Sequence, residues 1–154
     1  RDMLEKLSYE DGLTGLYNRN KFNHVLDAYT RKPPQRLSVV YMDLNNLKHT
    51  NDNFGHDAGD QLIRTAAHTI REVFGESTYR IGGDEFVAFL TDVDEAQLKA
   101  MIARMNQLMA QREANVSVGY SHREQGVNII EQLDEADNAM YAEKLVYRKL
   151  HSNR

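Results

Sequence analysis

The chain has 154 residues, enough for one domain with a sizeable core, and its 41% hydrophobic and 27% charged residues are typical of a globular protein. Its formal net charge of −4 argues against a protein that coats nucleic acid, because such a protein normally presents a basic face. The absence of cysteine excludes disulfides and thiolate metal sites and fits a reducing compartment. The sequence contains neither an apolar run long enough to span a bilayer nor a secretory signal.

Residues 1–10 are charged, with apolar side chains spaced as in a short helix. Two interpretations of this segment stay open: the end of a helical linker from an upstream domain, or a terminal helix of the same domain. Because the chain begins with Arg1, we expect a longer protein whose upstream regions lie outside this sequence. Residues 11–19 then form a turn punctuated by glycine.

The next elements are a helix and a buried strand. Phe22 and the apolar residues after it recur at helical spacing, with Asn18 or Asn20 available as the N-cap, and Pro33-Pro34 ends the helix. The β-branched run Leu37–Met42 predicts a buried strand. It is followed by Asp43, at the carboxyl end of the strand where ligands bind in α/β sheets.

The rest of the chain alternates helical and extended patterns. We expect, in order, a polar loop over 45–60, a helix with apolar residues from Leu62 to Val73, a hairpin over Tyr79–Leu90 turning at Gly82-Gly83, a methionine-rich helix over 98–109, a strand over 115–121 and a final helix over 130–150. This order predicts a single-domain α/β (α+β) sandwich, with a central mixed sheet flanked by helices.

Three carboxylates are the strongest candidates for chemistry. Asp43 follows a buried strand, while Asp84 and Glu85 follow two glycines that allow a ligand to approach the backbone closely. If the two strands pair, these carboxylates converge, and hard oxygen ligands suit Mg²⁺ together with substrate phosphates. The alternative is a common Gly-Gly hairpin with solvated acidic residues, which the pattern by itself favours.

Basic residues provide candidate phosphate contacts. Lys144 and Arg148 are one helical turn apart, and with Asp137 and Tyr141 we expect them on one face of the last helix, opposite Met140 and its apolar neighbours. Lys48, shortly after Asp43, is a further candidate. The alternative for all three basic side chains is ordinary solvated surface.

The polar segment 51–60 contains candidate guanine contacts. The Asp60 carboxylate can accept hydrogen bonds from guanine N1–H and the 2-amino group, which adenine does not offer in that pattern, and Asn51 can complement it. The alternative for Asp60 is a helix cap, since a helix is expected to begin there. His56 is another candidate for substrate binding, but a structural role suits it better because no nucleophile partner is evident.

Together these residues resemble the GGDEF family of bacterial diguanylate cyclases. The matching blocks are Asp11-Gly-Leu-Thr-Gly-Leu-Tyr-Asn-Arg19; Asp43-Leu-Asn-Asn-Leu-Lys48 with Asn51-Asp52, Gly55-His56 and Gly59-Asp60; Arg80-Ile-Gly-Gly-Asp-Glu-Phe86; Ser117-Val-Gly119; and Ala136-Asp137-Asn-Ala-Met-Tyr141 with Lys144. One such string is a weak signal, but five in order over essentially the whole chain form a strong one.

The resemblance implies a palm-like nucleotidyl cyclase fold with a mainly antiparallel sheet, occupying residues 11–154 after a linker over 1–10. It implies condensation of two GTP molecules into cyclic di-GMP and pyrophosphate between two domains of a homodimer, each holding one GTP. By motif, Asp43, the Leu44 carbonyl, Asp84 and Glu85 would bind Mg²⁺ or Mn²⁺; Asp84, Glu85 and Lys48 would be catalytic; Asn51 and Asp60 would bind guanine, with His56 nearby; and Lys48, Lys144 and Arg148 would hold the phosphates.

Some positions depart from the family pattern. Asn45 stands where the family often has a second Asp, and Leu47 where it often has Phe; neither change removes a metal ligand that the resemblance implies. The arginine and aspartate of the family's product-inhibition site fall on Val73 and Glu76. The missing arginine argues against feedback inhibition through that site, because a basic side chain is needed to bind the product; Arg71 lies off the matching position.

Several alternatives to an active cyclase remain. A catalytically silent module that binds GTP and regulates a neighbouring domain ranks second, since the motif is intact. Val73 argues against a cyclic di-GMP receptor, and Asp60 against a mixed-nucleotide cyclase. We expect an upstream sensory or regulatory domain as a partner and no nucleic acid. We expect the domain to be cytoplasmic. If the full-length protein has a membrane anchor, we expect it in an upstream segment outside this sequence.

Overall fold

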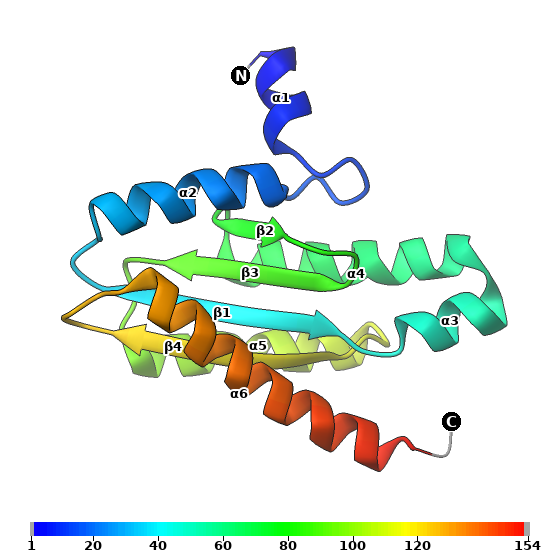
Figure 1. The fold of residues 1–154 in the computed structure, drawn as a ribbon. Helices are drawn as coiled ribbons and strands as arrows, with labels where there is room; N and C mark the ends of the chain where they lie inside the picture. The colour runs from blue at the N-terminus through cyan, green and yellow to red at the C-terminus, as the bar shows by residue number, and fades with distance from the viewer. Residues whose placement is uncertain (1, 153–154) are drawn as a thin grey trace.

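The computed structural model describes residues 2–152, without the side chains of residues 5–7, and contains a sheet between two layers of helices (Figure 1). The elements in chain order are α1 (Met3–Tyr9), α2 (Arg19–Arg31), β1 (Leu37–Leu44), α3 (Leu47–Phe54), α4 (His56–Phe74), β2 (Thr78–Arg80), β3 (Glu85–Leu90), α5 (Glu95–Gln111), β4 (Val116–Arg123) and α6 (Ile129–Leu150). Among the described residues, no helix has both the length and the hydropathy that a membrane span requires.

The sheet has the strand order β2-β3-β1-β4, and each neighbouring pair is antiparallel. The predicted α/β fold with a mainly antiparallel sheet is therefore confirmed. A single parallel bridge, between Tyr17 and Tyr79, extends the pattern beyond the named strands in the described part of the chain. The central strand β1 is hydrogen-bonded on both sides, so its residues are held more firmly than those of an edge strand.

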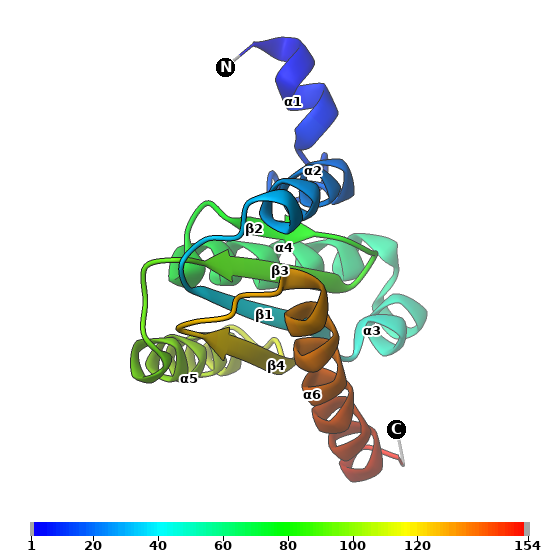
Figure 2. The same cartoon turned by 60° about the vertical axis from the view of Figure 1, so that its left-hand side comes forward.

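Side chains of β1 alternate between two hydrophobic clusters. Val39 and Tyr41 pack with residues of α2 and α6, whereas Val40 and Met42 pack with residues of α4 and α5. Figure 2 shows the same division, with α6 in front of the sheet and α4 and α5 behind it. This alternation is the period of two that a strand imposes, and it directs the next residue of the first set, Asp43, toward the face that α6 covers.

The expectation of a polar loop over 45–60 is wrong. The segment forms α3 and the first turn of α4, separated by Gly55, which has a φ of 91°. Asp60 consequently lies within α4 and does not cap it. The apolar pattern missed α3 because its surface is polar, and because Leu47 and Phe54 at its two ends are too few apolar residues to show a helical period.

Helix α6 packs directly against the backbone of β4 at Gly119. A Cβ atom added to Gly119 would lie 2.2 Å from the Met140 nitrogen and 2.3 Å from the Ala136 oxygen. Only glycine permits this approach without moving one of the two elements. The contact therefore determines how close α6 lies to the sheet.

We expect Gly119→Ala to lower the free energy of unfolding by about 3 kcal/mol, because the added methyl group overlaps helix backbone and not a movable side chain. Urea unfolding followed by circular dichroism measures the change. Gly12→Ala is the matched control, since a Cβ at Gly12 meets nothing within 4 Å. Equal stability of the two variants would show that the α6–β4 contact is not tight.

Candidate active site

The three predicted carboxylates converge at one end of the two central strands. Asp43 of β1 is paired in register with Glu85, the first residue of β3. The Leu44 backbone N–H donates a hydrogen bond to the Asp84 carbonyl oxygen at 2.8 Å, which holds the hairpin turn beside the end of β1. The convergence expected from the sequence is thus present.

A second set of contacts fixes the hairpin turn from outside. Arg80 donates to both carboxylate oxygens of Asp11, at 3.3 and 3.2 Å, and to the Gly83 carbonyl oxygen at 2.8 Å. Both side chains of this ion pair are mostly buried. Asp11 also accepts hydrogen bonds from the Thr14 backbone and hydroxyl. No role for Asp11 or Arg80 follows from the sequence pattern, although both lie in blocks that carry the family resemblance.

Lys144 lies on the buried face of α6, so the expectation that it faces away from Met140 is wrong. Ala136, Met140 and Lys144 follow one another at intervals of four residues, which places them on one face of a helix. Arg148 continues the same row but is exposed, because α6 runs past the edge of the sheet (Figure 1). Asp137 is half-buried, and Tyr141 is exposed.

The ammonium group of Lys144 is held by three oxygens. Nζ donates to Asp43 Oδ1 at 3.1 Å, to the Leu44 carbonyl oxygen at 3.2 Å and to Asn45 Oδ1 at 2.6 Å. Asn45 is itself 1% exposed, and its amide donates to Asn115 Oδ1 at 2.5 Å and to Ser117 Oγ at 3.0 Å. Asn45, which departs from the family pattern, is therefore a buried contact between Lys144 and β4.

An open cavity of about 240 Å³ lies next to this cluster. Its lining contains most of the predicted site residues, namely Asp43, Leu44, Lys48, Asp84, Lys144 and Arg148. Negative charge from β1 and from the turn before β3 thus faces positive charge from α3 and α6 across one cavity. Such an arrangement suits a phosphorylated ligand that carries a metal ion.

The predicted guanine contacts lie outside that cavity lining but close to each other. The Asn51 side chain packs against the backbone of Gly59, since a Cβ added there would overlap Asn51 Oδ1. Asp60 is the next residue of α4 and is half-buried. The Asn51 amide therefore lies against the residue that precedes Asp60, whereas His56 is exposed at the start of α4.

The electrostatics of the cluster oppose ionisation of its carboxyl groups. Burial raises the pKa of the Glu85 carboxyl, and neighbouring carboxylates, Asp43 foremost, raise it further. Burial also raises the pKa of Asp43, although the hydrogen bond and charge of Lys144 act in the opposite direction. The pKa of Asp137 is likewise raised, by burial and by Asp134. The site therefore favours added positive charge.

The residues present fit a divalent cation that is completed by a ligand. Within residues 2–152, no three acidic or histidine side chains lie close enough to form a metal site by themselves. Asp43 Oδ1 and the Leu44 carbonyl oxygen nevertheless already bind a cation, the Lys144 ammonium group. Hard oxygen donors of this kind suit Mg²⁺, which usually retains waters and takes phosphate oxygens as further ligands.

The family model described as "Diguanylate cyclase, GGDEF domain" matches residues 8–149. The chain belongs to this family. It is 30% identical over 155 residues to diguanylate cyclase DgcM of Escherichia coli, covering 93% of this chain and 38% of that protein. It is 36% identical over 156 residues to cyclic di-GMP phosphodiesterase PdeB of Shewanella oneidensis, covering 94% of this chain but 18% of that protein.

Solved structures of the family share the fold. The coiled coil and GGDEF domain of DgcB from Caulobacter crescentus, solved in complex with c-di-GMP, superimposes with a TM-score of 0.83 at 25% identity, covering 92% of this chain and 83% of that one. The FimX GGDEF domain from Pseudomonas aeruginosa gives a TM-score of 0.78 at 23% identity, covering 88% and 93% of the two chains. Relatives named diguanylate cyclase and relatives named cyclic di-GMP phosphodiesterase are thus both similar to this chain.

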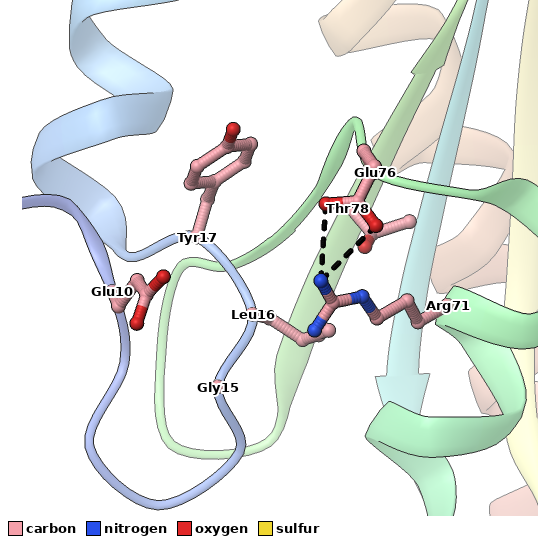
Figure 3. A pocket seen from close by; sticks show the side chains of 7 residues that line it. All are labelled: Glu10, Gly15, Leu16, Tyr17, Arg71, Glu76 and Thr78. Atoms are coloured by element: carbon pink, nitrogen blue, oxygen red, sulfur yellow. Dashed lines mark hydrogen bonds and ion pairs between the residues drawn. The ribbon is translucent and has the colours of Figure 1, made fainter. Parts of the chain in front are cut away.

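Val73 and Glu76, which match the positions of the family's product-inhibition site, lie near the C-terminal end of α4 and in the loop after it. Val73 is 8% exposed and belongs to the hydrophobic core. Glu76 accepts hydrogen bonds from Arg71 through both carboxylate oxygens, at 3.1 and 3.0 Å (Figure 3). The cavity beside this pair measures about 10 Å³, room for about one water molecule. The absence of feedback inhibition stays a prediction.

We expect Glu85→Gln to stabilise the metal-free domain at neutral pH by about 0.2–1 kcal/mol, the scale of a like-charge pair directly across two strands. Since the folded pKa of Glu85 is raised, its favourable contribution is complete below the unfolded pKa and is lost as the pH rises through the folded pKa. The gain should therefore vanish near pH 3. Urea unfolding at both pH values measures it.

Asp92→Asn is the matched control, because Asp92 is an exposed carboxylate just beyond the opposite end of β3. It should leave the free energy of unfolding unchanged at both pH values. A loss of stability in Glu85→Gln at neutral pH without metal would contradict the electrostatic description of the site.

Proposed function

We propose that this domain is an active diguanylate cyclase that converts two GTP molecules into one cyclic di-GMP and two pyrophosphates. In the reaction, the 3′-oxygen of each GTP forms a bond to the α-phosphorus of the other, and each α-phosphorus releases pyrophosphate. The observation that carries the proposal is the single cavity in which Asp43 and Asp84 face Lys48, Lys144 and Arg148. Membership of the GGDEF family supports the same assignment.

The basic residues of the cavity are proposed to bind the triphosphate. Lys48 and Arg148 are exposed at its rim, so they can contact phosphates without a change in the core. Their positive charge would stabilise the charge that develops during phosphoryl transfer. Asn51 and Asp60 are proposed to bind guanine, and the packing of the Asn51 side chain of α3 against Gly59, the residue of α4 before Asp60, supports this role.

Asp84 and Glu85 are proposed to accept the proton of the attacking 3′-hydroxyl group or to hold the cation that acidifies it. Asp43 and the Leu44 carbonyl would hold a divalent ion, Mg²⁺ or Mn²⁺, together with these carboxylates. When bound, such an ion neutralises phosphate charge and makes the 3′-hydroxyl a better nucleophile. The domain's own contribution is mainly alignment and charge stabilisation.

Two copies of the domain are proposed to meet face to face, because each domain is proposed to hold one GTP in this cavity and the reaction needs two GTP molecules. A two-fold axis would present each 3′-hydroxyl to the other α-phosphorus. Residues 1–10 are proposed to join residues 11–154 to an upstream regulatory region. Helix α1 stands away from the sheet, with Met3 and Leu4 exposed, which supports a linking role (Figures 1 and 2).

Incubation of the concentrated domain with GTP and Mg²⁺ should yield cyclic di-GMP, identified by chromatography and mass spectrometry. Glu85→Ala should lower turnover by at least about 10³-fold, the scale of losing a group that acts on the transition state. Specific activity should rise with protein concentration or with artificial dimerisation, since two domains must meet.

Asp92→Ala, at the opposite end of the hairpin strand, should retain full turnover. Wild-type-like activity of a folded Glu85→Ala variant would refute the assignment. GTP binding without any product, even from an artificial dimer, would favour the silent GTP-binding module instead.

Asp60→Ala should raise the KM for GTP by about 10–100-fold, because a hydrogen bond to a charged group contributes about 1.5–3 kcal/mol. It should also abolish discrimination between GTP and inosine triphosphate, which lacks the 2-amino group. Steady-state kinetics with both nucleotides measure the two effects. Asp57 is an exposed carboxylate in the first turn of the same helix, so Asp57→Ala should change neither the KM nor the discrimination. If Asp60→Ala still discriminates between the two nucleotides, Asp60 does not bind guanine.

A further inference from the structure

Lys144 occupies an unusual position for a residue expected to bind phosphate. Its side chain is 11% exposed, and all three of its ammonium protons have acceptors: Asp43 Oδ1, the Leu44 carbonyl and Asn45 Oδ1. Two of these three acceptors are the oxygens proposed above to hold the divalent ion. The ammonium group and the ion therefore compete for the same oxygens.

The two cations cannot share these oxygens without strong repulsion. A bound Mg²⁺ lies about 2.1 Å from its oxygen ligands. Since Nζ is 3.1 Å from Asp43 Oδ1 and 3.2 Å from the Leu44 oxygen, an ion on the same pair would lie at most about 5 Å from the ammonium group. At that distance in a half-buried site, the repulsion is large.

The position of Lys144 is built into the fold. The close packing of α6 on Gly119 brings the row Ala136, Met140 and Lys144 against the sheet. Asn45 supplies the shortest of the three hydrogen bonds, and contacts from β4 hold the Asn45 side chain in place. The ammonium group thereby compensates the charge of a carboxylate that is partly removed from water.

A new set of partners is available to Lys144 when it leaves. The residue also lines the cavity that contains Lys48 and Arg148, and its four-carbon side chain can redirect the ammonium group into that cavity. Without a phosphate there, the move would bring three cationic groups together. A bound triphosphate converts this repulsion into attraction.

We propose that Lys144 is an internal substitute for the divalent cation: it holds Asp43 and the Leu44 carbonyl in the metal-free domain and transfers to the triphosphate when metal binds. The inference rests on the proposed function in assigning these two oxygens to the metal. It makes metal and nucleotide binding mutually dependent, since each ligand stabilises the redirected lysine. Metal alone then binds weakly, and the nucleotide strengthens its binding.

The test measures Mn²⁺ binding without nucleotide, by electron paramagnetic resonance of the free ion, in the wild-type domain and in Lys144→Met. The variant keeps the length of the side chain and removes its charge, so Mn²⁺ affinity should increase by about tenfold or more. Addition of a non-hydrolysable GTP analogue should strengthen Mn²⁺ binding in the wild type. It should strengthen Mn²⁺ binding much less in Lys144→Met. Unchanged or weaker Mn²⁺ binding by Lys144→Met would overturn the inference.

Arg148→Met is the matched control for charge alone. It removes a cation one helical turn away that lines the same cavity but is exposed at its rim. Its effect on Mn²⁺ affinity should be much smaller than that of Lys144→Met. An equal increase in both variants would show a general charge effect and refute the exchange.

Two further measurements keep the inference testable if Lys144→Met folds poorly. The melting temperature of Lys144→Met should rise more with added Mn²⁺ than that of the wild type, because the metal replaces the missing ammonium group. In the wild type, nuclear magnetic resonance of the Lys144 ammonium group should show its hydrogen-bonded signal lost at saturating Mg²⁺. A signal that persists at saturation would overturn the inference, whatever the variant does.

None of these measurements requires turnover. A domain that shows the exchange but makes no cyclic di-GMP would retain the inference and lose the proposed function. A domain that makes cyclic di-GMP while its Lys144 signal ignores Mg²⁺ would do the reverse.

Discussion

The contact between helix α6 and strand β4 at Gly119 sets the geometry on which the site depends. Because no side chain separates them, the helix lies against the strand backbone, and one row of its residues faces the sheet. The row begins with the small Ala136, continues with Met140 and reaches Lys144 where the sheet ends. If α6 lay a few ångströms farther from the sheet, the side chains of this row would be less buried. The ammonium group of Lys144 would then not reach Asp43.

The charges at the ends of the central strands explain why this contact matters. Three carboxylates converge there, and burial together with mutual repulsion raises the pKa of Asp43 and of Glu85. The metal-free fold tolerates these converging carboxylates because the Lys144 ammonium group donates a hydrogen bond to Asp43. The cluster is thus electrostatically unfavourable by itself, as expected where binding energy is reserved for a ligand.

Two parts of the fold without direct chemistry support this cluster. Asp11 and Arg80 connect the first signature turn to the Gly82-Gly83 hairpin, so the acidic residues after the glycines are held from outside. Asn45 connects β1 to β4 through Asn115 and Ser117. Some blocks of the family signature contribute no proposed ligand, and these contacts give such blocks a structural role. The residues that each contact joins lie far apart in the sequence.

The sequence by itself determined the order of most elements and the hairpin turn at Gly82-Gly83, because apolar periodicity and glycine chemistry are local. The convergence of Asp43 with Asp84 and Glu85 followed only once β1 was seen to pair with β3. It did not predict α3, whose polar surface carries no periodic signal, nor the burial of Lys144. Only the tertiary structure decided that Lys144 donates a hydrogen bond to Asn45, since 99 positions separate them in the chain and no local pattern encodes which strand a helix will cross.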